Sequence, residues 1–127
     1  MQKKILIIED DSLLMATLSE AFLKEGFDVL TAKDGEVGIQ EAENNKPDAI
    51  VLDLLMPKQN GLSVLESIRS NMGDWGKSVP VFILTNYDPQ DDPTMKTVLN
   101  HEPVTYLEKS SWQLDDIVGK VKQTLTK

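Results

Sequence analysis

Acidic residues follow two short apolar runs in this sequence. Glu9, Asp10 and Asp11 come directly after a run of isoleucine and leucine, and Asp53 comes directly after a run of alanine, isoleucine, valine and leucine. Carboxylates that lie close together repel one another unless a cation or hydrogen-bond donors balance them. An all-oxygen ligand set suits Mg²⁺, which keeps several waters and needs few protein ligands. The pattern therefore predicts a Mg²⁺ site if the two segments meet in space.

Two more polar residues end apolar segments later in the chain. Thr85 follows residues 79–84, and Lys109 lies just past residues 104–107. A metal ion beside Asp53 would let an anionic phosphoryl group approach that carboxylate, while the hydroxyl and the ammonium group each take one of its oxygens. Carboxylates are known to form acyl phosphates. We therefore predict that Asp53 is a phosphoacceptor and that Thr85 and Lys109 stabilise the group it accepts.

Each of these residues also has a purely structural interpretation. The acidic triplet could cap a helix, because acids favour helix N-termini. Asp53 and Thr85 could be turn or capping residues, and Lys109 could be an ordinary surface lysine. The combination is more specific than any single member, because four such residues at four strand ends on one side of a sheet are unexpected by chance.

The apolar pattern alternates between short runs and helical spacing, and this alternation sets the expected fold. It predicts a parallel sheet with helices on both faces. Ligands bind such sheets at the carboxyl ends of the strands, which is where the polar residues lie. We expect strands at 5–8, 27–32, 49–52, 79–84 and 104–107. We expect helices from Ser12 as N-cap to a stop at Gly26, from 34–35, around 62–68, at 94–100 and at 112–125, with a polar loop at 73–78 that holds Trp75.

Composition restricts the function classes. The 127 residues fit one domain, which we place at 1–127, and 40% of them are hydrophobic. A formal net charge of −8 argues against direct binding to nucleic acid. No apolar run reaches the roughly 18 residues of a membrane span, and there is no cysteine. We therefore expect a cytoplasmic protein without membrane contacts.

Four segments, in order, resemble the receiver domains of two-component response regulators. They are Ile-Leu-Ile-Ile-Glu-Asp-Asp at 5–11, Pro-Asp-Ala-Ile-Val-Leu-Asp-Leu-Leu-Met-Pro at 47–57 with Gly61, Leu84-Thr85, and Tyr-Leu-Glu-Lys at 106–109. The resemblance covers essentially the whole chain. It implies a flavodoxin-like (βα)5 fold, a three-layer sandwich with a five-stranded parallel sheet in the order 2-1-3-4-5.

The same resemblance implies roles for individual residues. Glu9 and Asp10 match the metal-binding acidic pair, with the backbone carbonyl of Leu55 as a further ligand beside Asp53. Thr85 matches a switch hydroxyl, and Tyr106 matches an aromatic residue that turns inward when Thr85 moves toward the phosphoryl group. Asp11 lies one place beyond the pair and is assigned a secondary role.

The resemblance also implies partners. A sensor histidine kinase or phosphotransfer protein would supply the phosphoryl group, and a downstream protein or a missing output domain would receive the signal. A homodimer would form through the fourth helix, fifth strand and fifth helix. Asn86, Ser110 and residues 100–103 depart from the family pattern, which usually has a small residue, a proline and a Gly-Ala turn there. Leu55 and Tyr87 flank the predicted site, and we expect both to slow loss of the phosphoryl group.

Two competing functions remain open. A Mg²⁺-dependent phosphatase with an aspartyl nucleophile typically carries a second acid two residues later, where this chain has Leu55. A degenerate receiver would bind partners without phosphorylation, although all the predicted site residues are present. Signalling by phosphorylation, without turnover of a separate substrate, is the function that the sequence favours.

Overall fold

The computed structural model describes residues 2–53, 61–85, 104–108 and 113–125. The side chains of Val104, Tyr106, Glu108 and Thr85 are outside this description. Strands and helices alternate through most of the chain. The strands are β1 (Lys4–Ile8), β2 (Asp28–Ala32), β3 (Ala49–Leu52), β4 (Val81–Thr85) and β5 (Val104–Glu108). The helices are α1 (Ser12–Lys24), α2 (Gly35–Asn45), α3 (Gly61–Asn71), α4 (Gly73–Ser78) and α6 (Leu114–Leu125).

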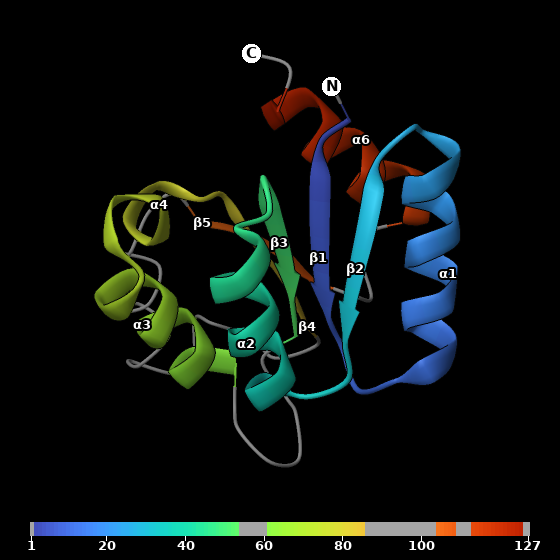
Figure 1. Cartoon of the computed structure of the whole chain (residues 1–127). Coiled ribbons are helices and arrows are strands. Elements are labelled where there is room, and N and C mark those ends of the chain that lie inside the picture. Colours follow the sequence, from blue (N-terminus) through green and yellow to red (C-terminus); the bar gives the residue numbers. More distant parts are fainter. Residues whose placement is uncertain (1, 54–60, 86–103, 109–112, 126–127) are drawn as a thin grey trace.

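All strand pairs in the sheet are parallel, and the order is β2-β1-β3-β4-β5. The parallel arrangement and the order 2-1-3-4 match the expectation from the sequence. Figure 1 shows α2 and α3 on one side of the sheet and α1 and α6 on the other. No helix in the described residues is long and apolar enough to cross a membrane.

Successive residues of each strand alternate between two hydrophobic cores, as the pleat of a strand requires. In β1, Leu6 and Ile8 face the core under α2 and α3, whereas Ile5 and Ile7 face the core under α1 and α6. All four side chains are 0% exposed. Fully burying one such side chain contributes about 1.5–3 kcal/mol. The near-continuous apolar runs seen in the sequence therefore reflect strands that are buried on both faces.

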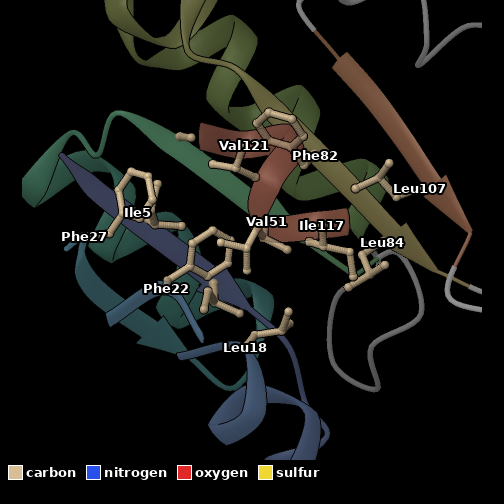
Figure 2. Packing of buried hydrophobic residues seen from close by; sticks show 13 residues of the cluster. Ile5, Leu18, Phe22, Phe27, Val51, Phe82, Leu84, Leu107, Ile117 and Val121 are labelled. Atoms are coloured by element: carbon tan, nitrogen blue, oxygen red, sulfur yellow. The ribbon is translucent and has the colours of Figure 1, made fainter. Parts of the chain in front are cut away.

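Aromatic residues occupy the core between the sheet and helices α1 and α6 (Figure 2). Phe22 of α1 and Phe27, which precedes β2, meet edge to face with ring centroids 5.7 Å apart. This geometry is one that aromatic pairs prefer. Phe82 of β4 and Val121 of α6 lie in the same core (Figure 2). The contacts hold α1 and α6 against the sheet and thereby set where α1 begins, directly beside the acidic segment.

The structure corrects two predictions about local structure. Asp11, and not Ser12, is the N-cap of α1: its Oδ1 accepts hydrogen bonds from the backbone N–H groups of Leu13 (3.0 Å) and Leu14 (3.2 Å). The predicted loop at 73–78 is instead the short helix α4.

Tertiary contacts explain why α4 forms despite two glycines. The Arg69 guanidinium of α3 donates to the Gly76 carbonyl oxygen at 2.8 Å. The Trp75 indole Nε1 donates to the Pro47 carbonyl oxygen at 3.0 Å, and the ring packs partly against the core. These partners lie outside α4, so the helix propensity of residues 73–78 alone could not predict the helix.

Most other boundaries agree with the sequence to within one or two residues. Gly26 has φ +89° just past the end of α1, a conformation that glycine adopts without strain. Asp34 is the N-cap of α2, as predicted, and its side chain accepts from Val37 N at 2.9 Å. The last helix begins at Leu114, two residues after the predicted start. The helix predicted at 94–100 lies outside the described residues.

Candidate metal and phosphoacceptor site

Backbone hydrogen bonds between neighbouring strands align the residues that follow them. The Glu9 N–H donates to the Ala32 carbonyl at 3.0 Å, and the Asp53 N–H donates to the Ile8 carbonyl at 3.0 Å. Ile8 is in register with Ala32 on one side and Leu52 on the other. Glu9 and Asp53 are therefore the first residues beyond two adjacent paired strands. The two acidic segments therefore meet in space, which is the condition for the predicted Mg²⁺ site.

The carboxylates of Glu9, Asp10 and Asp53 form one group, in which one oxygen from each residue lies within 4.8 Å of the others. Glu9 and Asp53 are each 3% exposed, whereas Asp10 is exposed to solvent. Asp10 is thus the member of the group that reaches the surface. Three formal negative charges this close favour a bound cation.

The donor set fits a small hard cation. All three groups offer oxygen, and oxygens on opposite sides of Mg²⁺ are separated by about 4 Å. The observed group, with its oxygens within 4.8 Å, is close to this size. Within the described residues, Glu9, Asp10 and Asp53 are the ones that would hold such an ion.

Asp11 has a different role from its two neighbours. Its side chain caps α1, and its backbone N–H donates to Glu9 Oε1 at 3.2 Å. The capping interpretation of the acidic triplet therefore applies to Asp11. The hydrogen bond to Glu9 also links the start of α1 to the carboxylate group, so the secondary role assigned to Asp11 has a structural basis.

The remaining predicted site residues are described only in part. Thr85 is the last residue of β4, in register with Glu108 at the end of β5. Tyr106 lies in β5, in register with Ile83. Both are placed by their backbone alone. Leu55 and Lys109 lie outside the described residues, as do Asn86, Tyr87 and Ser110.

Lys33 follows β2 directly and was not among the predicted site residues. Lys33 lines a hollow of about 300 Å³ together with Glu9, Asp10 and residues of α1. The signal that could have found it is the same one that identified Asp53. Each is the first residue after a strand that is paired with β1, so the strand order 2-1-3 places Lys33 and Asp53 on either side of Glu9.

These features define a class: a doubly wound parallel α/β domain with an acidic oxygen-ligand site at the carboxyl ends of its central strands. A family model described as the response regulator receiver domain matches residues 5–122. The chain belongs to this family, and it is a receiver domain of a two-component response regulator.

Curated relatives are longer than this chain. It is 36% identical over 95 residues to the alkaline phosphatase synthesis transcriptional regulatory protein PhoP of Bacillus subtilis, a match that covers 75% of this chain and 38% of the relative. It is 35% identical over 122 residues to the transcriptional regulatory protein PrrA of Mycobacterium tuberculosis. This match covers 96% of this chain and 49% of the relative. The chain thus spans about half the length of these relatives or less.

Solved structures share the fold. The receiver domain of the Francisella response regulator 1452 is 26% identical, with a TM-score of 0.83 and coverage of 98% of both chains. A CheY-like receiver domain protein from Methanospirillum hungatei has a TM-score of 0.86 over 99% of this chain and 95% of its own, at 22% identity. The second likeness concerns the fold alone.

Proposed function

We propose that residues 1–127 form one receiver domain that accepts a phosphoryl group on Asp53 from a sensor histidine kinase or phosphotransfer protein. The observation that carries this proposal is the group formed by the Glu9, Asp10 and Asp53 carboxylates, with oxygens within 4.8 Å at the ends of β1 and β3. Family membership supports it, because response regulator receiver domains are signalling phosphoacceptors.

In the proposed reaction an Asp53 carboxylate oxygen attacks the phosphorus atom. A P–O bond forms, and the bond from phosphorus to the donor breaks, with its electron pair leaving on the donor. Glu9, Asp10 and the Leu55 backbone carbonyl would hold Mg²⁺ beside Asp53, where the ion would supply the positive charge that offsets the approach of an anion to a carboxylate. Thr85 and Lys109 each bind an oxygen of the transferred group.

The output is a shift between two conformations. Thr85 and Tyr106 are the proposed switch residues, since they lie on the adjacent strands β4 and β5. A downstream protein or an output domain beyond this sequence reads the change, and a homodimer through the face that contains β5 is one proposed form of the active state. The curated relatives are named as transcriptional regulators, which favours an output domain of that kind.

The test uses small phosphoryl donors and intact mass. The protein is incubated with Mg²⁺ and acetyl phosphate or phosphoramidate, and we expect one added phosphoryl group. Asp53→Asn should remove the addition, and a chelator should suppress it. Asp28→Asn makes the same chemical change at an exposed position at the start of β2, so it should be modified like the wild type.

Other outcomes would contradict the proposal. Phosphoryl uptake that persists in Asp53→Asn would place the acceptor elsewhere. Sustained turnover of small phosphate esters would favour an aspartyl phosphatase. If a purified histidine kinase that phosphorylates other receivers and both small donors all leave the mass unchanged, the chain is a degenerate receiver.

A further inference from the structure

The sheet places one lysine beside the acidic group. Ala32 at the end of β2 and Leu52 at the end of β3 are both in register with Ile8. Glu9 follows Ile8 in the centre. Lys33 follows Ala32 on one side, and Asp53 follows Leu52 on the other. Paired strands lie about 5 Å apart, so the backbone of Lys33 is a direct neighbour of Glu9, on the side opposite Asp53.

Lys33 lines a hollow beside α1 together with two of the three acidic residues, Glu9 and Asp10. The hollow has a volume of about 300 Å³ and is lined by Glu9, Asp10, Thr31 and Lys33 with four residues of α1. Thr31 and Lys33 are two residues apart, and such residues face the same side of a strand. Both therefore face α1, where Asp10 and Glu9 also border the hollow. Lys33 is the one cationic residue among those that line this hollow in the described part of the chain.

The charge of Lys33 is not neutralised by an ion pair within the described residues, so it can interact with the acidic group. The residue is exposed, and within the part of the chain that the structure describes it makes no ion pair at the salt-bridge distance. A lysine that lies near carboxylates without forming an ion pair acts through the long-range attraction of its charge, not through one fixed hydrogen bond. It lowers the repulsion among the carboxylates when no metal is bound, and it repels a divalent cation that binds to them.

We propose that Lys33 is an internal competitor for the Mg²⁺ site, which stabilises the metal-free acidic group and weakens Mg²⁺ binding. This inference rests on the proposed function, because it takes Glu9, Asp10 and Asp53 as the metal ligands. Lys33 acts on the ligands and is a positioning residue, not a catalytic one. Its consequence is that the state ready for phosphorylation needs a higher free Mg²⁺ concentration to reach half occupancy than it would without the lysine.

The first measurement is a Mg²⁺ titration followed by the backbone amide signals of Glu9, Asp10 and Asp53 in NMR spectra. A unit charge roughly 5–10 Å from a divalent ion in water-like surroundings changes affinity several-fold. We expect Lys33→Gln to lower the Kd for Mg²⁺ about threefold to tenfold at low ionic strength. The difference should shrink as salt is added, because salt screens exposed charges.

Lys3→Gln is the matched control. It removes the same charge from an exposed lysine before the other end of β1, roughly 20 Å from Glu9 along the strand. At that separation a unit charge changes the affinity of a divalent ion in water-like surroundings by at most about twofold, and added salt lowers this further. Lys3→Gln should therefore change the Kd less than twofold. An equal effect of both variants would overturn the proposal, since it would show dependence on net charge alone.

Thermal unfolding provides a second readout that does not depend on NMR. In a chelator, Lys33→Gln should have a lower Tm than the wild type, and saturating Mg²⁺ should close this gap. A Kd for Lys33→Gln within twofold of the wild-type value, or a Tm gap that persists in Mg²⁺, would overturn the role of Lys33 and leave the metal site intact. Absence of saturable Mg²⁺ binding in the wild type would instead overturn the metal site of the proposed function, and this inference with it.

Discussion

Asp10 and Asp11 are adjacent and exposed, yet their side chains have different surroundings. Asp10 belongs to the carboxylate group with Glu9 and Asp53. Asp11 caps α1 by accepting from two backbone N–H groups. The difference follows from position, because Asp10 is one residue closer to the end of β1. Two predictions at this scale separate the metal-binding role from the capping role.

The first prediction concerns metal binding. In the wild type, Mg²⁺ at 100 times its Kd should raise the free energy of unfolding by about 2.7 kcal/mol. Asp10→Asn should lose most of this increment because it removes a charged ligand. Urea unfolding with and without Mg²⁺ measures the increment. Asp11→Asn removes the same charge one residue later and retains a good N-cap, so it should lose only the longer-range attraction for the ion and keep more than half of the increment.

The second prediction concerns the cap itself. Asp11→Ala should lower the free energy of unfolding by about 1 kcal/mol, since the N–H groups of Leu13 and Leu14 lose their acceptor. Ser12→Ala should be nearly neutral, because Ser12 is the first helical residue and not the cap. Chemical denaturation of both variants without Mg²⁺ makes the comparison. The opposite order would restore Ser12 as the cap.

At the scale of the elements, one glycine determines how closely α2 approaches the sheet. A Cβ atom on Gly38 would lie 2.6 Å from Cδ1 of Ile8. Glycine inside a helix costs about 1 kcal/mol relative to alanine, so the sequence alone presents Gly38 as a weakness. The close contact gives the reason for it. Ile8 directly precedes Glu9, and the packing of α2 therefore bears on the end of β1 that carries the acidic site.

A matched pair of glycine substitutions tests this. Gly38→Ala should lower the free energy of unfolding by about 1–3 kcal/mol, because overpacking outweighs the gain in helix propensity. Gly119→Ala in α6 should raise it by about 0.5–1 kcal/mol, because a Cβ there meets no atom within 4 Å. Thermal or urea unfolding gives both values. Stabilisation by both substitutions would show that Ile8 moves aside without cost.

Helix α4 shows how two elements hold a third. Arg69 is 6% exposed and donates to the Gly76 carbonyl oxygen. Burial lowers the pKa of Arg69 below its ordinary value, but arginine stays charged at neutral pH. A charged donor makes a stronger hydrogen bond than a neutral one. Gly76 is itself confined, since a Cβ there would collide with the Ile68 carbonyl oxygen.

At the scale of the whole molecule, β1, β3 and β4 are the interior strands of the sheet. Each has a strand on both sides and a helical layer on both faces. The side chains of Ile5 to Ile8 are 0% exposed, and Ile50 and Leu52 are equally buried. The acidic site is therefore built at the ends of two of these interior strands, while Asp10 and the start of α1 lie at the surface.

This arrangement predicts the order of amide hydrogen exchange. The amides of residues 5–8 and 50–52 should exchange only through global unfolding, whereas those of the six-residue helix α4 should exchange through local opening. Native-state exchange followed by NMR over a range of denaturant concentrations measures both. Equal protection of α4 and β1 would mean that the ties through Arg69 and Trp75 make α4 part of the same cooperative unit.

Much of the fold and part of the site followed from the sequence by itself. Runs of β-branched and aliphatic residues separated by helical spacing determined a parallel sheet with two helical layers, because strands buried on both faces cannot carry polar residues between their ends. Polar residues at the strand ends then determined where chemistry could occur. Together with the strand order that the family resemblance implies, this was enough to predict that Glu9, Asp10 and Asp53 would meet. The roles of Thr85, Lys109, Leu55 and Tyr106 remain predictions.

Other features depended on contacts between residues far apart in the chain, and only the tertiary structure decided them. Helix α4 forms because Arg69 and Pro47 satisfy groups within it, and the glycine at position 38 has a packing reason because Ile8 lies against it. Lys33 becomes relevant to the acidic group only because β2 pairs with β1. Periodicity reports which face of an element is buried, but it does not report which residue of another element lies against that face.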